Sequence, residues 1–229
     1  MKTKSFQSGI LLLSVVVAVF FSSCGRSKEK KTADSPESST EKIRLFNGKD
    51  LSNWTFYLKD PSVDASQVFM VHGDIVHITG DPFGYMRTKE SYSDYTLHVE
   101  WRYPGEASNS GVFIHAQLPD TLWPMSIECQ LKAGSAGDFV CMGGSDINER
   151  ADKSVRSVKK MAESSEKPAG EWNTMEVTCI SDNIDVFVNG VHQNKATGST
   201  IKEGHICLQS EGKDIEFVHE RMPSWRSTA

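Results

Sequence analysis

Charged and amide side chains recur at alternate positions in three stretches near the middle of the chain. They are His98, Glu100 and Arg102 in 95–103, His115 and Gln117 in 110–117, and Glu128 and Gln130 in 126–131. Alternating residues of a strand share one face, so neighbouring strands would gather these groups on one surface. Acid, imidazole and amide groups beside aromatic rings suit a sugar-sized polyol. The alternative is the solvated outer face that any β-sandwich has.

Two further segments could add to this surface. Asn109 precedes Ser110 and Gly111 at the start of the second stretch. Its amide can both donate and accept hydrogen bonds, and the glycine permits a close approach of the backbone. Trp172 follows a loop rich in proline and glycine and could stack on a sugar face, or it could belong to the core.

The segments that must position these groups have the pattern of short strands separated by turns. Asn189-Gly190 predicts a type I′ hairpin between 183–188 and 191–193, because both turn positions need a positive φ. Further strands are expected at 43–46, 54–58, 67–71, 74–79, 137–142, 173–180, 204–210 and 214–219, and only 149–165 has a weak helical pattern. The expected fold class is all-β, an antiparallel jelly-roll β-sandwich with little helix.

The composition agrees with one globular domain. The chain has 229 residues, of which 38% are apolar and 24% charged, which excludes collagen, coiled coils and wholesale disorder. The net charge of −5 leaves no basic excess for phosphates, so no nucleic-acid partner is expected. Cysteines 129, 141, 179 and 207 lie in apolar runs and suit either buried hydrophobic positions or a disulfide.

The N-terminal segment has the features of an export signal. Lys2 and Lys4 precede an apolar run over 10–21 that is too short to span a bilayer. Small residues before Cys24 resemble a bacterial lipobox, which predicts a signal peptide over 1–23 and lipidation of Cys24; an ordinary secretory signal is the alternative. The polar segment 24–41 is expected to be a flexible tether, which leaves 42–229 as a single domain. The expected location is the bacterial cell envelope, lipid-anchored, in the periplasm or at the cell surface.

Six segments together resemble the 3-keto-disaccharide hydrolase family, a bacterial domain with a concanavalin- or laminin-G-like jelly roll. They are 45–54, 109–114, 127–130, 170–173, 188–190 and 204–210. Their order and spacing cover nearly all of 43–219.

The resemblance implies cleavage of a glycosidic bond in a sugar that is already oxidised at C3. A C3 ketone acidifies the C2 proton, so a base can remove it, the C1 substituent is expelled, and water then adds. Such an enzyme needs a base, a donor for the enolate oxygen and an acid, without the paired carboxylates of ordinary glycosidases. The implied partners are a carbohydrate substrate, a keto-sugar glycoside, and an upstream sugar oxidoreductase; we expect no cofactor and no metal.

This chemistry leads to a hypothesis about the role of each candidate residue. Glu128 is the expected general base or acid, with His115 as its proton-transfer complement, because histidine titrates near neutral pH. The expected substrate-binding residues are Asn109, Gln130, Glu100, Arg102 and Trp172. The strand that carries Glu128 has an amide at Gln130, which argues against a two-carboxylate mechanism on that strand; a carboxylate from another strand stays open.

Other functions remain open on the sequence. A non-catalytic glycan-binding lipoprotein would present flat, exposed aromatic residues, whereas an enzyme would gather proton-transfer groups in a pocket. A structural envelope protein would have no cleft. The stretch 153–161 has near-helical spacing and suggests a surface helix or, less simply, a lid.

Overall fold

The computed structural model describes residues 42–218. The expected signal peptide 1–23, the lipidation site Cys24, the tether 24–41 and residues 219–229 lie outside the described residues. The described part is almost entirely β-structure, and its one helical element is a single 3-10 turn at Ala65–Gln67. It forms two antiparallel sheets of seven strands each, so the expected jelly-roll sandwich is confirmed.

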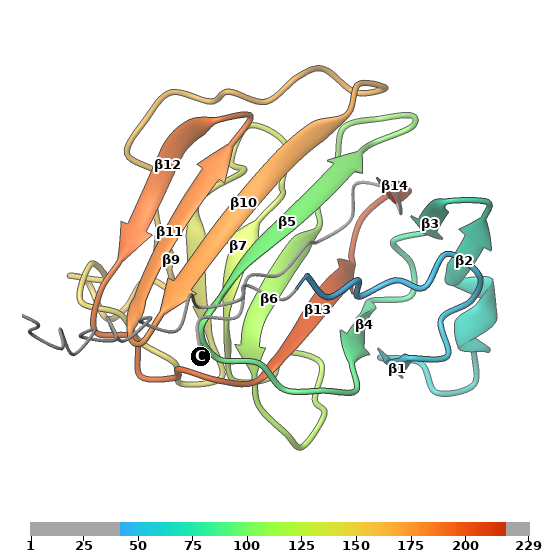
Figure 1. Ribbon diagram of the computed structural model, residues 1–229, viewed down its shortest axis with the longest axis horizontal. Coiled ribbons are helices and arrows are strands. Elements are labelled where there is room, and N and C mark those ends of the chain that lie inside the picture. Colours follow the sequence, from blue (N-terminus) through green and yellow to red (C-terminus); the bar gives the residue numbers. More distant parts are fainter. Residues whose placement is uncertain (1–41, 219–229) are drawn as a thin grey trace, which may run out of the picture. The chain divides into compact units, whose positions relative to one another are not determined.

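The strands of each sheet come from both halves of the sequence (Figure 1). In spatial order, the first sheet consists of β1 (Trp54–Leu58), β4 (Gly84–Thr88), β13 (His205–Ser210), β6 (Gly111–Ala116), β7 (Ser126–Gln130), β8 (Phe139–Met142) and β9 (Ser157–Val158). The second consists of β12 (Val191–Ala196), β11 (Asn183–Val188), β10 (Asn173–Ile180), β5 (Tyr95–Arg102), β14 (Ile215–Val218), β3 (Ile75–Ile78) and β2 (Phe69–His72).

The main core lies between the two sheets and follows the alternation of their strands. Val112 and Ile127 from the first sheet and Leu97, Val99 and Val177 from the second belong to one buried cluster. Each of these side chains is at most 1% exposed. Burying these apolar faces against each other supplies the dominant driving force for the fold.

The outer face of the first sheet carries a second, smaller apolar cluster. Phe113, Val140, Met142 and Cys207 belong to it, and Trp123 packs against it from a loop. Their strand neighbours pack in the main core, so these side chains must point the other way. Phe113, Met142 and Cys207 are at most 2% exposed, so this part of the outer face is covered, in contrast to the fully solvated face expected of an ordinary sandwich.

Several expectations about individual elements are confirmed and several are wrong. The hairpin at Asn189-Gly190 joins β11 to β12, and both turn residues have a positive φ, of 48° and 79°. Strand β4 was not expected, because it begins with a glycine two positions after Pro82 and that start lacks a strand-like pattern. The four cysteines described are buried and free, so none forms a disulfide.

Residues 149–165 do not form the helix that their weak pattern suggests. This segment is irregular apart from the short strand β9, and neighbouring strands take its backbone hydrogen bonds. The Asp138 carboxylate accepts from the Lys160 amide at 2.9 Å, and the Met161 amide donates to the Gln193 carbonyl at 2.6 Å. Long-range partners of this kind override a marginal local helix propensity.

Candidate active site

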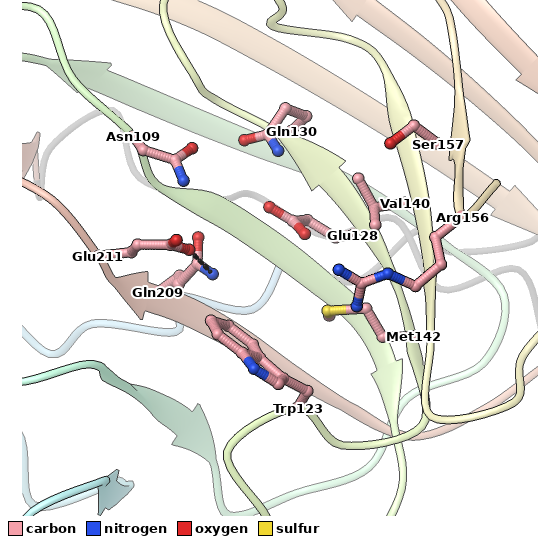
Figure 2. A pocket seen from close by; sticks show the side chains of 10 residues that line it. All are labelled: Asn109, Trp123, Glu128, Gln130, Val140, Met142, Arg156, Ser157, Gln209 and Glu211. Atoms are coloured by element: carbon pink, nitrogen blue, oxygen red, sulfur yellow. Dashed lines mark hydrogen bonds between the residues drawn. The ribbon is translucent and has the colours of Figure 1, made fainter.

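A pocket of about 200 Å³ opens on the outer face of the first sheet. It is lined by Asn109, Trp123, Glu128, Gln130, Val140, Met142, Arg156, Ser157, Gln209 and Glu211 (Figure 2). Strands β7, β8, β9 and β13 supply most of the lining, and loops next to β6, β7, β9 and β13 supply the rest. The pocket therefore lies over the middle of the sheet and towards its β9 edge.

Glu128 occupies the floor of this pocket. In the register of the sheet, it lies between Phe113 of β6 and Val140 of β8, both members of the outer apolar cluster. Its residue is 5% exposed, and no group within 42–218 donates a hydrogen bond to its carboxylate. Burial raises the pKa of Glu128 to about 8, repulsion by Glu211 adds to the shift, and Arg156 opposes it. A carboxyl group in this state carries its proton at neutral pH and can donate it.

Gly111 makes the room that the Glu128 side chain needs. The two residues lie on adjacent strands, where Gly111 pairs with Gln130 and Phe113 pairs with Glu128. A methyl group placed on Gly111 would overlap the Oε1 atom of Glu128. The close approach expected at this glycine is thus present, and its partner is the carboxyl group in the pocket.

Glu211 brings a second carboxyl group to the same pocket from the segment that follows β13. The Gln209 Nε2 donates to its Oε2 at 2.7 Å (Figure 2). Burial raises the pKa of Glu211, while hydrogen bonds from Asn109 and Gln209 and the charge of Lys132 counteract part of the shift. Two mutually repelling carboxyl groups near one another do not both ionise readily, which favours a state in which one of them keeps its proton.

Two amide oxygens in the pocket lack hydrogen-bond partners. The Oδ1 of Asn109 and the Oε1 of Gln209 are buried, and nothing in residues 42–218 donates to them. Buried acceptors are satisfied in most proteins, and these two oxygens beside one pocket are free to accept hydrogen bonds from a ligand. Gln130 uses its own Oε1 to accept from the amides of Leu131 and Lys132, at 3.0 Å and 2.8 Å. Its side-chain nitrogen is thereby left as the group available to a ligand.

Arg156 and Trp123 complete the walls of the pocket. Arg156 lies just before β9, and its carbonyl accepts from the Cys141 amide at 2.9 Å, which anchors this edge. Its guanidinium lies across the pocket from the amides (Figure 2). The indole of Trp123 forms the lower wall in the same view and lies 6.4 Å, centroid to centroid, from Phe83. Flat apolar rings beside polar groups are a common arrangement for holding sugars.

The structure does not bring His115 to this pocket. A register shift between β6 and β13 and a φ of 53° at His115 break the alternation after Phe113. Ala116 takes the place on the outer face, and the imidazole instead packs edge-on against Tyr95, 5.5 Å between ring centroids. Burial lowers the pKa of His115, which keeps the ring neutral. The expectation that Glu128 and His115 share a hollow is therefore wrong. A β-bulge places His115 on the opposite face of its strand.

Glu100, Arg102 and Trp172 also lie away from the pocket. They belong to β5 and to the loop before β10, so they are part of the second sheet, and the expectation that all three polar stretches share one surface is wrong. Arg102 Nε donates to Glu216 at 2.7 Å, and its guanidinium lies 4.6 Å from the ring centroid of Trp172. Glu100 lies 3.2 Å from the Nε2 of His98. Alternation assigns residues to a face of their own strand, and it does not say which sheet holds that strand.

Sequence reasoning found part of the site. Asn109, Glu128 and Gln130 line the pocket as expected, whereas Trp123, Gln209 and Glu211 were not proposed. Gln209 stands in the family-like segment 204–210, which is the one signal that could have pointed to it. Within residues 42–218, no three histidine, cysteine or acidic side chains cluster as metal ligands. The same residues include no helix with the length and hydrophobicity of a membrane span.

Comparisons with known proteins define the class of this fold. A protein from Parabacteroides distasonis that is provisionally assigned as a glycosyl hydrolase superposes with a TM-score of 0.59 at 18% identity, over 81% of this chain and 93% of the other. Porphyranase B from Zobellia galactanivorans gives 0.59 at 14%, over 87% and 97%. A carbohydrate-binding module from Bacillus subtilis gives 0.55 at 10%, over 76% and 96%. The fold is that of the jelly-roll glycosidases and carbohydrate-binding modules.

The family follows from the sequence match. Residues 41–219 match the model of the 3-keto-alpha-glucoside-1,2-lyase-like domain, and the chain belongs to that family. No curated protein sequence matches it. Family and fold together make this a carbohydrate-active protein.

Proposed function

We propose that this domain cleaves the glycosidic bond of 3-keto-glycosides, and that the pocket around Glu128 is where it does so. The observation that carries the proposal is a buried carboxyl group with a pKa near 8, placed beside a second carboxyl group and two unsatisfied amide oxygens. Such groups are costly to keep in a fold and cluster at sites of proton transfer. The family to which the chain belongs supports the choice of substrate.

The proposed reaction is an elimination followed by addition of water. A carboxylate removes the C2 proton, and the C2–H electron pair forms an enolate with its negative charge on the C3 oxygen. The enolate then collapses to restore the C3 ketone, a C1–C2 double bond forms, and the C1–O bond breaks as the leaving oxygen takes a proton from an acid. Water then adds its oxygen to C1 and gives a proton to the group that acted as the acid, while the group that acted as the base returns its proton to C2. This gives the free 3-keto-sugar and restores both carboxyl groups.

The pocket offers a residue for each role. Glu128 is assigned as the acid, because its raised pKa keeps the proton near neutral pH. Glu211 is assigned as the base, since it is the ionised member when Glu128 holds the shared proton. It takes the place that the sequence analysis gave to His115. Arg156 is assigned to the developing enolate oxygen, where a fixed positive charge stabilises the transition state.

The amides and the indole are assigned to substrate binding. The free oxygens of Asn109 and Gln209 would accept from sugar hydroxyl groups, and the side-chain nitrogen of Gln130 would donate. Trp123 would pack on the ring. Together these groups favour a sugar with hydroxyl donors over an apolar ligand.

The test is cleavage of a 3-keto-glucoside and of its unoxidised counterpart by the purified protein. We expect release from the keto-sugar alone, with a slower rate when C2 carries deuterium in place of hydrogen. Release from the unoxidised glycoside alone would contradict the proposal and indicate conventional hydrolysis. Binding without release would favour the alternative of a non-catalytic glycan-binding lipoprotein.

We also propose that the protein is exported and lipid-anchored to the cell envelope through Cys24, downstream of a sugar oxidoreductase that makes the keto-sugar. The charged n-region, the short apolar run and the small residues before Cys24 support the anchor. Cys24→Ala should move the protein from the membrane fraction to the soluble fraction. An unchanged distribution would contradict lipidation at that cysteine.

A further inference from the structure

A second hollow of about 340 Å³ lies between the segment that follows β1 and the segment that precedes β4. It is lined by Lys59, Asp60, Pro61, Asp81, Pro82 and Phe83. The Lys59 amide donates to the Phe83 carbonyl at 2.8 Å, so the two sides of the hollow are held together by the strand pair. The hollow is therefore built on the same sheet as the pocket around Glu128.

Neighbouring aromatic rings line the two hollows. Trp123 lines the first and Phe83 lines the second, and their centroids are 6.4 Å apart. Phe83 precedes Tyr85 by two positions, and Tyr85 belongs to the outer apolar cluster, so both rings lie on the outer face. A group that extends from a ligand in the first pocket past Trp123 would approach Phe83 and the second hollow.

The chemistry of the second hollow differs from that of the first. Its lining combines the ring of Phe83 and the two prolines with three charged residues, Lys59, Asp60 and Asp81. The Nζ of Lys59 lies 6.0 Å from the centroid of the Phe83 ring. Asp60 already accepts from the amide and the hydroxyl of Ser62, at 2.9 Å and 2.7 Å. No buried polar atom without a partner lies there among the described residues, whereas the first pocket has two. The second hollow is suited to an apolar ring and makes no demand for hydroxyl groups.

We propose that this hollow, lined by Phe83, is the subsite for the leaving group, and that it takes an aromatic ring attached at C1 of the sugar. The inference rests on the proposed function, which puts the sugar in the pocket around Glu128. The preferred substrates are then 3-keto-glycosides of planar aromatic alcohols. A ring that packs against Phe83 gains affinity that a methyl group cannot supply.

The experiment is a titration of the Glu128→Gln protein with three ligands that differ only in the group at C1 of 3-keto-glucose: phenyl, glucosyl and methyl. We expect the phenyl glycoside to bind about fivefold more tightly than the methyl glycoside. Adding Phe83→Ala should reduce this ratio to about one while the affinity for the methyl glycoside stays within about twofold. Phe56→Ala, which removes a 36% exposed ring from the neighbouring β1, is the matched control and should keep the preference.

Equal affinity for the phenyl and methyl ligands would overturn the subsite, as would a phenyl preference that survives Phe83→Ala. A preference for the glucosyl ligand over the phenyl ligand would overturn the aromatic assignment. Turnover by the wild-type protein reports on the proposed function separately: a phenyl preference without any cleavage would retain the subsite and reject the reaction. If none of the three ligands binds, both are rejected.

Discussion

Acidic side chains lie on the outer faces of both sheets, but among the described residues those on the second sheet have partners and Glu128 on the first sheet does not. On the second sheet, Arg102 pairs with Glu216 at 2.7 Å, and Glu100 lies 3.2 Å from His98. On the first sheet, Glu128 receives no hydrogen bond from the described residues, and burial raises its pKa to about 8. The charged side chains named on the second sheet pair with one another. The buried Glu128 carboxyl group on the first sheet has no such partner within 42–218, which lowers the stability of the fold.

This difference identifies the site better than the number of polar groups does. A paired ion on an outer face contributes little beyond solvation and local order. A buried carboxyl group without a partner is retained in a fold when it serves another purpose. Matched substitutions on the two outer faces test whether this difference in pairing corresponds to a difference in function.

The largest expected effect is on turnover when Glu128 is replaced. Glu128→Gln keeps the shape of the side chain and removes the proton that the mechanism uses, so kcat should fall by about 10³ with a 3-keto-glucoside. Glu100→Gln, on the other sheet, should keep kcat/KM within about threefold. Equal losses in the two variants would show that the faces do not differ in function.

Arg156→Met should have the next largest effect. Loss of the guanidinium removes the positive charge assigned to the enolate oxygen, so kcat should fall by about 10² while KM changes little. The matched control is Arg102→Met, which removes an equivalent charge from the second sheet and should leave kcat unchanged. A rise in KM with an unchanged kcat for Arg156→Met would place this residue in substrate binding only.

Gly111→Ala tests the room made for the carboxyl group. The added methyl group would overlap the Oε1 of Glu128, so the side chain must shift and kcat should fall by about tenfold. Gly105→Ala, where a methyl group would contact nothing within 4 Å, is the control and should keep full activity. An active Gly111→Ala enzyme would show that the position of Glu128 is not critical.

The smallest expected effect is on stability as a function of pH. Glu128 has a folded pKa of about 8, above the ordinary value of 4.5, so the folded state holds a proton that the unfolded chain releases between these values. Because of this group, the free energy of unfolding falls as pH rises from about 4.5 to about 8. Above pH 8 its contribution no longer changes with pH. Glu128→Gln should gain about 1–3 kcal/mol over the wild type by pH 8 and match it below pH 4.5, as measured by urea denaturation.

Glu176→Gln supplies the control for this pH series. Its carboxylate lies on β10 of the second sheet and is 55% exposed, so the substitution should give no gain that grows with pH. A stability difference for Glu128→Gln that stays constant between pH 4 and pH 8 would contradict the raised pKa.

The sequence predicts the fold well because alternation and turns are local properties. The strand pattern of 95–103 and the hairpin at Asn189-Gly190 are both present, at nearly the expected bounds. The same local pattern assigned Glu128 to a polar face and thus found the centre of the pocket. Periodicity over a few residues is enough for decisions of this kind.

The remaining features of the site depend on long-range geometry that no local pattern contains. The bulge that turns His115 towards Tyr95 arises where β6 pairs with β13, about ninety residues further along the chain. Glu211 reaches the pocket only because β13 inserts between β4 and β6. Sheet order and register shifts, rather than residue types, separate the predicted site from the observed one.

The most direct test of the central claim is a crystal structure of the Glu128→Gln protein with a bound 3-keto-glucoside. The account predicts the sugar in the pocket of the first sheet, with hydroxyl groups donating to Asn109 Oδ1 and Gln209 Oε1 and with C2 facing Glu211. A sugar bound instead over Trp172 and Arg102 on the second sheet would contradict it.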